Sequence, residues 1–175
     1  MVLALPRAGR GKVQYVMAKQ HKDPNNKVVG TNRKATFDYF VEEKIEAGLM
    51  LVGTEVKALR EGHLNLRDSY ASIANGKAVL HNCHIGTYSH GNQMNHEPLR
   101  PRTLLLHKKE IERLTDKVKL KGLTIVPLRL YFNDRGRAKL ELAVARGKKT
   151  YDRRETVKKR EASREIDRAM KDSRS

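Results

Sequence analysis

The sequence predicts a mainly β fold, in which an antiparallel β-barrel of the OB-fold type carries short helices and a basic C-terminal tail. Three observations support this class. Several segments alternate apolar and polar residues with a period of two, turn sequences join neighbouring segments, and residues 155–171 are mostly charged with no continuous apolar face. A small α+β sandwich would give similar signals and stays open as an alternative.

We expect three parts along the 175 residues. Residues 1–31 are rich in Gly, Pro, Asn and Lys, which is typical of a disordered lead. Met17 begins a different stretch, so residues 1–16 are expected to come from an upstream start and not to be native. Residues 32–149 would form the folded body, and residues 150–175 a basic tail.

A long strand and a short helix are predicted at the start of the body. Apolar residues alternate from Phe37 to Val52, and Gly48 within this run suggests a bulge. A helix is expected to begin at Gly53, with Thr54 as its N-cap and Gly62 as its end.

A hairpin follows, made of strands at 70–73 and 77–85. Asn75-Gly76 lies between them and suits a type I′ turn, whose two central residues both need a positive φ. Residues 86–102 read as a loop.

The clearest helix signal is the apolar spacing of Ile111, Leu114 and Val118. We expect residues 104–106 to enter this helix and Gly122 to end it.

Two final strands are predicted at 123–132 and 137–145, joined by a turn at 133–136. Pro127 cannot donate a ladder hydrogen bond, so the first of them should be an edge strand or carry a bulge.

The composition favours a polyanionic partner. The chain has 37 Lys and Arg against 20 Asp and Glu, giving a net charge of +17 and a pI of about 10.2. Nucleic acid is the favoured partner, and an anionic membrane surface is the weaker reading. The single cysteine, Cys83, allows no intramolecular disulfide, and the sequence has no apolar run of about 18 residues that could span a bilayer. We therefore expect a cytoplasmic protein.

Enzymatic readings find little support in the sequence. His81, Cys83 and His84 lack a second pair with zinc spacing, so we predict neither a metal nor a cofactor. Glu42 and Glu46 could seat a metal in a nuclease, but adjacent acids on a strand are usually solvated. We expect that the protein is not an enzyme.

Basic clusters favour RNA. Arg33-Lys34 precede the first predicted strand, Arg100 and Arg102 precede the long helix, and residues 107–109 lie at its N-terminus, where free amides attract phosphate. Aromatic residues make up only 5% of the chain, so affinity should rest on phosphate contacts and shape, which suits folded RNA.

The tail has a helical signature. Asp152 and Glu155 are spaced like a capping box, with Asp152 as N-cap. Val157, Ile166 and Met170 form a stripe too thin to dock on the body. We predict a tail that is disordered when free and helical when held in an RNA-lined channel.

Several motifs, in order along the chain, closely resemble one known family. They are Asn32-Arg33-Lys34-Ala35, Asp38-Tyr39-Phe40, Glu46-Ala47-Gly48, residues 53–60, Asp68-Ser69-Tyr70, residues 101–107 and Ala145-Arg146-Gly147-Lys148-Lys149. Over residues 26–171 the sequence resembles the SmpB family (SsrA-binding protein, small protein B). Proteins of this family are partners of transfer-messenger RNA.

This resemblance implies an OB-fold body, no catalytic activity and a role in trans-translation. The body would bind the tRNA-like domain of transfer-messenger RNA, support its aminoacylation and delivery with elongation factor Tu, and stand in for the missing anticodon arm. The tail would enter the empty decoding site and mRNA channel of a stalled ribosome. A monomer is expected.

The charge clusters and the resemblance together predict the contact residues. In the body, RNA contacts are expected at Arg33, Lys34, Glu46, Lys57, Arg102, Leu105, His107, Lys108, Gly147, Lys148 and Lys149. In the tail, ribosome contacts are expected at Tyr151, Asp152, Arg153, Arg154, Lys158, Lys159 and Arg160. Thr103 and Arg153 stand where the family frequently has Lys.

Two other classes stay open from the residues alone. One is a ribosomal or assembly protein with a basic tail. The other is an RNA-processing enzyme that uses Glu42 or Glu46 with a divalent metal.

Overall fold

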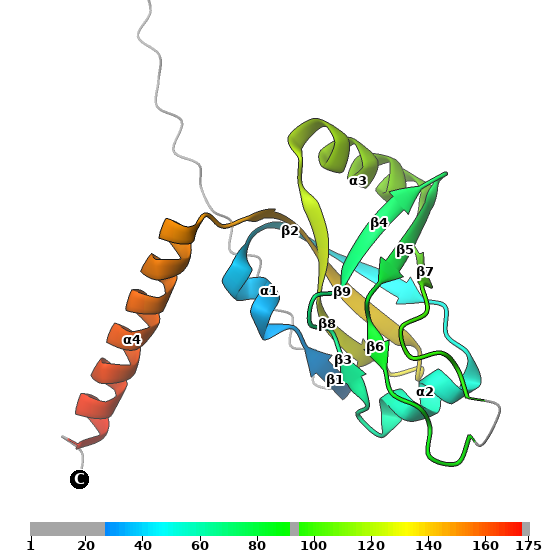
Figure 1. The fold of residues 1–175 in the computed structure, drawn as a ribbon, viewed down its shortest axis with the longest axis horizontal. Coiled ribbons are helices and arrows are strands. Elements are labelled where there is room, and N and C mark those ends of the chain that lie inside the picture. The colour runs from blue at the N-terminus through cyan, green and yellow to red at the C-terminus, as the bar shows by residue number, and fades with distance from the viewer. Residues whose placement is uncertain (1–26, 92–94, 173–175) are drawn as a thin grey trace, which may run out of the picture.

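The computed structural model describes residues 27–91 and 95–172, and Figure 1 shows their arrangement. The strands of the main sheet are β1 (Lys27–Thr31), β2 (Tyr39–Leu49), β4 (Tyr70–Ala74), β5 (Lys77–His81), β7 (Arg102–Leu105), β8 (Thr124–Phe132) and β9 (Ala138–Gly147). A two-stranded sheet consists of β3 (Leu64–Asn65) and β6 (His84–Ile85). The helices are α1 (Arg33–Asp38), α2 (Gly53–Arg60), α3 (Lys108–Lys121) and α4 (Thr150–Asp172).

Antiparallel pairing closes the main sheet into a barrel. The strand order β8–β4–β5–β7–β2–β9 returns to its start because β9 also pairs with β8. β1 adds to β8 outside this ring. A closed ring leaves no long unpaired edge, which confirms the predicted barrel over the sandwich alternative.

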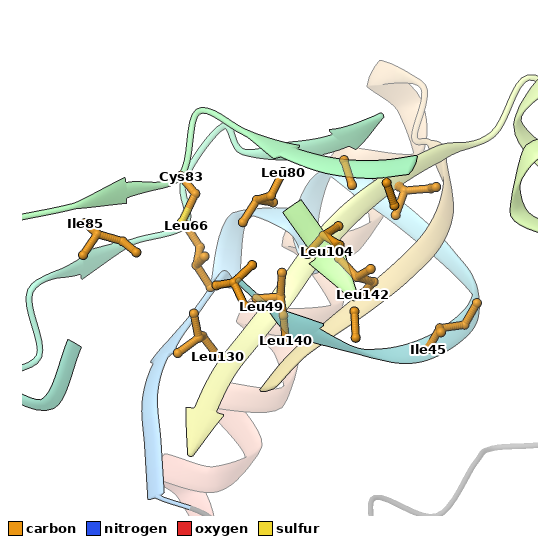
Figure 2. Close-up of a cluster of buried hydrophobic side chains, with 14 of the residues drawn as sticks. Ile45, Leu49, Leu66, Leu80, Cys83, Ile85, Leu104, Leu130, Leu140 and Leu142 are labelled. Atoms are coloured by element: carbon orange, nitrogen blue, oxygen red, sulfur yellow. The ribbon is translucent and has the colours of Figure 1, made fainter. Parts of the chain in front are cut away.

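The core lies inside this ring. Figure 2 shows Leu80 of β5, Leu104 of β7, and Leu140 and Leu142 of β9 gathered in one cluster of buried side chains. On β2, the odd-numbered residues from Ile45 onward are buried and the even-numbered ones are mostly exposed. The period-two alternation therefore assigned the inner face of this strand correctly.

Two predictions at the start of the body were wrong. Lys27–Thr31 pairs with β8 as a strand, although it lies within the segment 1–31 expected to be disordered; residues 1–26 lie outside the described residues. Phe37 and Asp38 end the short helix α1 and are not strand residues. The side chain of Asn32 caps this helix by accepting a hydrogen bond from the Ala35 amide at 3.0 Å.

Gly48 does not form the expected bulge. The irregularity in β2 lies between Val41 and Glu43, where the register with β9 shifts. Gly48 instead pairs with both β7 and β9, and a Cβ there would lie 3.1 Å from Cβ of Leu105. A larger residue at this position would press on the Leu105 side chain of the neighbouring strand β7.

Other turn and helix signals are confirmed. Asn75 and Gly76 have φ of 51° and 70°, as a type I′ turn requires. Gly122 ends α3 in the left-handed conformation. β8 shifts register between Pro127 and Arg129, so the bulge prediction holds and the edge-strand option does not. Residues 104–106 do not enter the helix, because Leu104 and Leu105 belong to β7.

A buried ion cluster joins α2 to β7. Glu55 and Arg102 are both fully buried, with Arg102 Nε donating to Glu55 Oε1 at 2.8 Å. Arg100 Nη2 donates to Glu55 Oε2 at 2.5 Å, and the Val52 amide donates to the same oxygen at 2.9 Å. The predicted cap Thr54 is wrong, because the N-cap of α2 is Val52, whose backbone amide donates to Glu55.

This cluster keeps Glu55 ionised. Burial alone would raise its pKa, but the hydrogen bonds from Arg100, the Val52 amide and Arg102 outweigh burial and lower the pKa below its ordinary value of 4.5. The stability that the carboxylate contributes is present above pH 4.5 and is lost as the pH falls toward the lowered folded-state pKa.

The tail forms helix α4, which stands apart from the barrel and approaches it only near α1 (Figure 1). The helix begins at Thr150, three residues before Arg153, where an N-cap at Asp152 would start it. Asp152 is therefore not the N-cap: its Oδ2 accepts from the Lys149 amide at 3.0 Å, three residues back. The helical form agrees with the expectation, and disorder of the free tail stays a prediction.

We predict that Glu55→Gln destabilises the fold by about 3–5 kcal/mol at pH 7, because it leaves the buried Arg102 guanidinium without its counter-charge. Urea unfolding monitored by circular dichroism measures this. Glu42→Gln, an exposed carboxylate on β2, is the matched control and should stay within about 0.5 kcal/mol of the parent. Equal unfolding midpoints for the two variants would contradict the assignment.

Candidate nucleic-acid interface

One groove gathers three of the predicted contact residues. It has a volume of about 730 Å³ and runs between the second half of β2, β7 and the start of α3. Glu46 from β2, Leu105 from β7 and His107 before α3 all line it. Leu105 is 52% exposed although it is apolar, so it offers a contact surface and not a core position.

Cations surround this groove. Lys44, Lys77, Arg113 and Lys139 line it together with the three residues above. Sequence reasoning missed all four, because they come from separate segments and each looks like a solvated surface charge. Lys44 and Lys139 could have been found from strand pairing, since both flank Glu46 on the exposed face of the β2–β9 ladder.

The Glu46 carboxylate is fixed within this cationic field. Tyr131 Oη donates a hydrogen bond to Oε2, and Lys139 Nζ lies 2.9 Å from Oε1. Burial would raise the pKa of Glu46, but the hydrogen bonds from Tyr131 and Lys139 outweigh burial and lower it. Burial and the contact with Glu46 raise the pKa of Tyr131, so its hydroxyl remains a donor.

The start of α3 carries His107 and Lys108 as exposed side chains. Glu110 Oε2 accepts from the His107 amide at 2.8 Å, so this helix N-terminus is already capped by a carboxylate of its own chain. Basic side chains of the groove are therefore better placed for phosphate than these helix amides.

A second group of predicted residues meets at α1. The Lys148 amide donates to the Asp38 carbonyl at 2.8 Å, and Lys148 Nζ lies 5.0 Å from the Phe40 ring centroid. Gly147 and Lys149 flank it and are exposed. Arg33 and Lys34 lie on α1 itself, so five of the predicted contact residues lie on or beside this short helix.

Two predicted residues do not fit these groups. The prediction that Arg102 contacts RNA is corrected, because its side chain is fully buried. Each of its three guanidinium nitrogens donates to Glu55 or to a carbonyl within the protein. It cannot contact RNA in this structure. Lys57 is exposed on α2, where its Nζ lies 5.2 Å from the Tyr88 ring centroid, away from both groups.

The predicted tail residues lie along α4. Tyr151 is 69% exposed, and a hydrogen bond to Glu155 raises its pKa. Arg153 Nε lies 3.5 Å from Asp38 Oδ1 on α1. Arg154 and Lys158 are exposed, while the side chains of Lys159 and Arg160 lie outside those that the structure describes.

Within the described residues, no group of three or more His, Cys, Asp or Glu side chains could hold a metal ion. Cys83 is buried, and burial raises its pKa to about 11. None of the described helices combines the length and apolar character that crossing a bilayer requires.

Comparisons with known proteins identify the family. A family model described as SmpB protein matches residues 29–172. The chain belongs to the SmpB protein family. A relative from Moorella thermoacetica named SsrA-binding protein is 56% identical over 146 residues, covering 83% of this chain and 94% of the relative. Another of that name, from Symbiobacterium thermophilum, is 58% identical over 143 residues, covering 82% of this chain and 90% of the relative.

A solved structure gives the same answer for the fold. It is described as "tmRNA-SmpB: a journey to the center of the bacterial ribosome" and matches with a TM-score of 0.60 and 50% identity, over 70% of this chain and 85% of that one. SmpB proteins are RNA-binding proteins and not enzymes, which confirms the prediction on that point. The resemblance inferred from the motifs is confirmed as well.

We predict that Tyr131→Phe raises the pKa of Glu46 toward its ordinary value of 4.5, because the carboxylate loses a hydrogen bond. A carbon-detected NMR pH titration of the Glu46 carboxyl group measures this. Tyr88→Phe removes a hydroxyl elsewhere on the surface and should leave the Glu46 titration unchanged. If both variants titrate like the parent, the Tyr131 hydroxyl does not hold the carboxylate.

Proposed function

We propose that this chain binds the tRNA-like domain of transfer-messenger RNA through the groove between β2, β7 and α3, and acts in trans-translation. The observation that carries the proposal is the gathering of Glu46, Leu105 and His107 in one cation-lined groove. These three residues are distant in the sequence, and each matches a family position for contact with this RNA.

The groove chemistry suits folded RNA. Lys44, Lys77, Arg113 and Lys139 can meet phosphates, while the ionised Glu46 offers acceptors to donors such as a ribose 2′-hydroxyl or a base N–H. A carboxylate among cations repels bare phosphate and therefore favours a particular placement of the backbone around it.

The basic element around α1 and the tail form the second half of the proposal. Gly147, Lys148 and Lys149 would contact RNA beside the body, and α4 would enter the decoding site and mRNA channel of a stalled ribosome. Tyr151 and the residues after it would meet the ribosomal RNA there. Delivery with elongation factor Tu, a monomeric state and a cytoplasmic location complete the proposal.

The alternatives are less well supported. A nuclease using Glu42 or Glu46 would need a metal, whereas Glu46 is committed to Tyr131 and Lys139. A stoichiometric ribosomal protein would have no use for a groove that separates transfer-messenger RNA from tRNA. Binding to the tRNA-like domain, compared with an elongator tRNA of equal charge at about 150 mM salt, tests this point.

We predict that Leu105→Ala and Glu46→Gln each weaken binding to the tRNA-like domain by about tenfold, as expected for central contact residues. Fluorescence anisotropy with labelled RNA measures this. Leu120→Ala and Glu42→Gln are matched controls, because Leu120 is 83% exposed on α3 and neither residue lines the groove. Equal losses in variants and controls would exclude the groove as the binding site.

Removal of residues 151–175 is expected to spare binding of the body to the tRNA-like domain and to abolish peptide tagging on stalled ribosomes. A full-length variant with residues 151–175 shuffled keeps the tail charge and should also fail to tag. Tagging is measured in a reconstituted translation system with a truncated message. Tagging by the truncated protein would refute the channel role, and tagging by the shuffled one would reduce it to charge.

A further inference from the structure

A second, smaller pocket lies at the opposite end of β2 from the groove. It has a volume of about 240 Å³ and is lined by Lys34, Asp38, Tyr39, Asp68, Tyr70 and Thr124, among others. On β2, Tyr39 lines the pocket and Lys44 is the first residue that lines the groove, five residues or about 17 Å farther along the strand. Ala35 and Asp38 of α1 also line this pocket.

Tyr70 gives this pocket a rigid aromatic surface. Its side chain is 43% exposed, and its ring stacks on His81 with centroids 5.2 Å apart and an interplanar angle of 21°. Tyr70 and His81 face each other across the β4–β5 ladder, and Ser72 Oγ lies 2.8 Å from His81 Nε2. A ring already held in this way loses little conformational freedom when a further ring stacks on it.

Two carboxylates line the pocket, together with the Lys34 amine and the hydroxyls of Ser69 and Thr124. Asp38 and Asp68 both line it, and an ionised carboxylate can only accept hydrogen bonds. Lys34 Nζ lies 2.6 Å from Asp68 Oδ1, which holds that carboxylate in place at the rim. Arg33 and Lys148 also lie on or beside α1, so cations for a phosphate are close to the acceptors.

We infer that this pocket takes a single unpaired guanine of RNA. The base would stack on Tyr70 and donate its N1–H and 2-amino hydrogens to Asp38 or Asp68, with its phosphate near Arg33 or Lys34. Of the four bases, guanine presents adjacent ring and amino N–H donors on one edge, which matches a carboxylate. The pocket is smaller than sites for drug-sized ligands, so it suits one base and not a duplex.

This inference rests on the proposed RNA-binding function but adds a separate contact. The groove variants at Glu46 and Leu105 test the proposed function, and neither residue lines the pocket. Failure at the pocket would therefore leave the groove result unchanged. Either transfer-messenger RNA or ribosomal RNA could supply the guanine.

The first experiment titrates the full-length ¹⁵N-labelled protein with GMP, AMP, CMP or UMP in the presence of excess inorganic phosphate. We expect GMP to shift the amides of Tyr39, Ser69, Tyr70 and Thr124 at the lowest concentration. Tyr70→Ser should weaken GMP binding by about tenfold or more, because it removes the stacking surface, whereas Tyr70→Phe keeps that surface and should bind GMP. Equal shifts from all four nucleotides, or unchanged GMP binding by Tyr70→Ser, would overturn the inference.

The second experiment finds the source of the base. Tyr70→Ser and Tyr70→Phe are compared for binding to the tRNA-like domain and to isolated small ribosomal subunits. A selective loss by Tyr70→Ser in one of the two assays supports the inference and identifies the RNA that supplies the guanine. No loss in either assay would overturn it.

Discussion

The buried pair of Glu55 and Arg102 is the constraint on which the rest of the molecule depends. Arg102 begins β7, and its guanidinium ties that strand to α2 through Glu55 and to the preceding loop through the carbonyls of Pro98 and Arg100. Leu105 and His107 follow three and five residues later, so their place in the groove is set by this anchor. A charge that costs free energy to bury is kept here because it fixes the position of a binding strand.

β2 is the second organising element, because it connects the two ends of the molecule. Ile45, Ala47 and Leu49 of β2 fill the barrel, and the alternate residues Lys44 and Glu46 line the groove. Its first residue, Tyr39, lies beside α1 and the base of the tail. One closed barrel therefore holds the groove and the smaller pocket at opposite ends of the same strand.

Local signals predicted the elements whose cause is local. The alternation in β2, the Asn75-Gly76 turn and the left-handed Gly122 each follow from the conformational preferences of a few residues, and the structure has them. Arg102 shows the limit: a basic residue in a basic segment looks the same in the sequence whether it faces RNA or a buried glutamate. Leu104 and Leu105 were assigned to a helix because an apolar run fits both periods, and only pairing with β2 and β5 makes them a strand. The groove cations were missed for the same reason, since strand pairing brings them together.

Contacts with the body hold the first turn of helix α4, although the helix has no hydrophobic core of its own. Tyr151, Val157 and Ile166 of α4 are exposed. Among the described residues, the contacts of this helix with the body are mainly those with α1. Its first turn is nonetheless fixed, because the Lys148 amide bonds to Asp38, the Lys149 amide bonds to Asp152, and Arg153 pairs with Asp38. The body therefore sets where the helix starts and which way it points, and leaves the rest of the helix surface to a partner. The chain carries a net charge of +17, which favours a polyanionic partner for this surface.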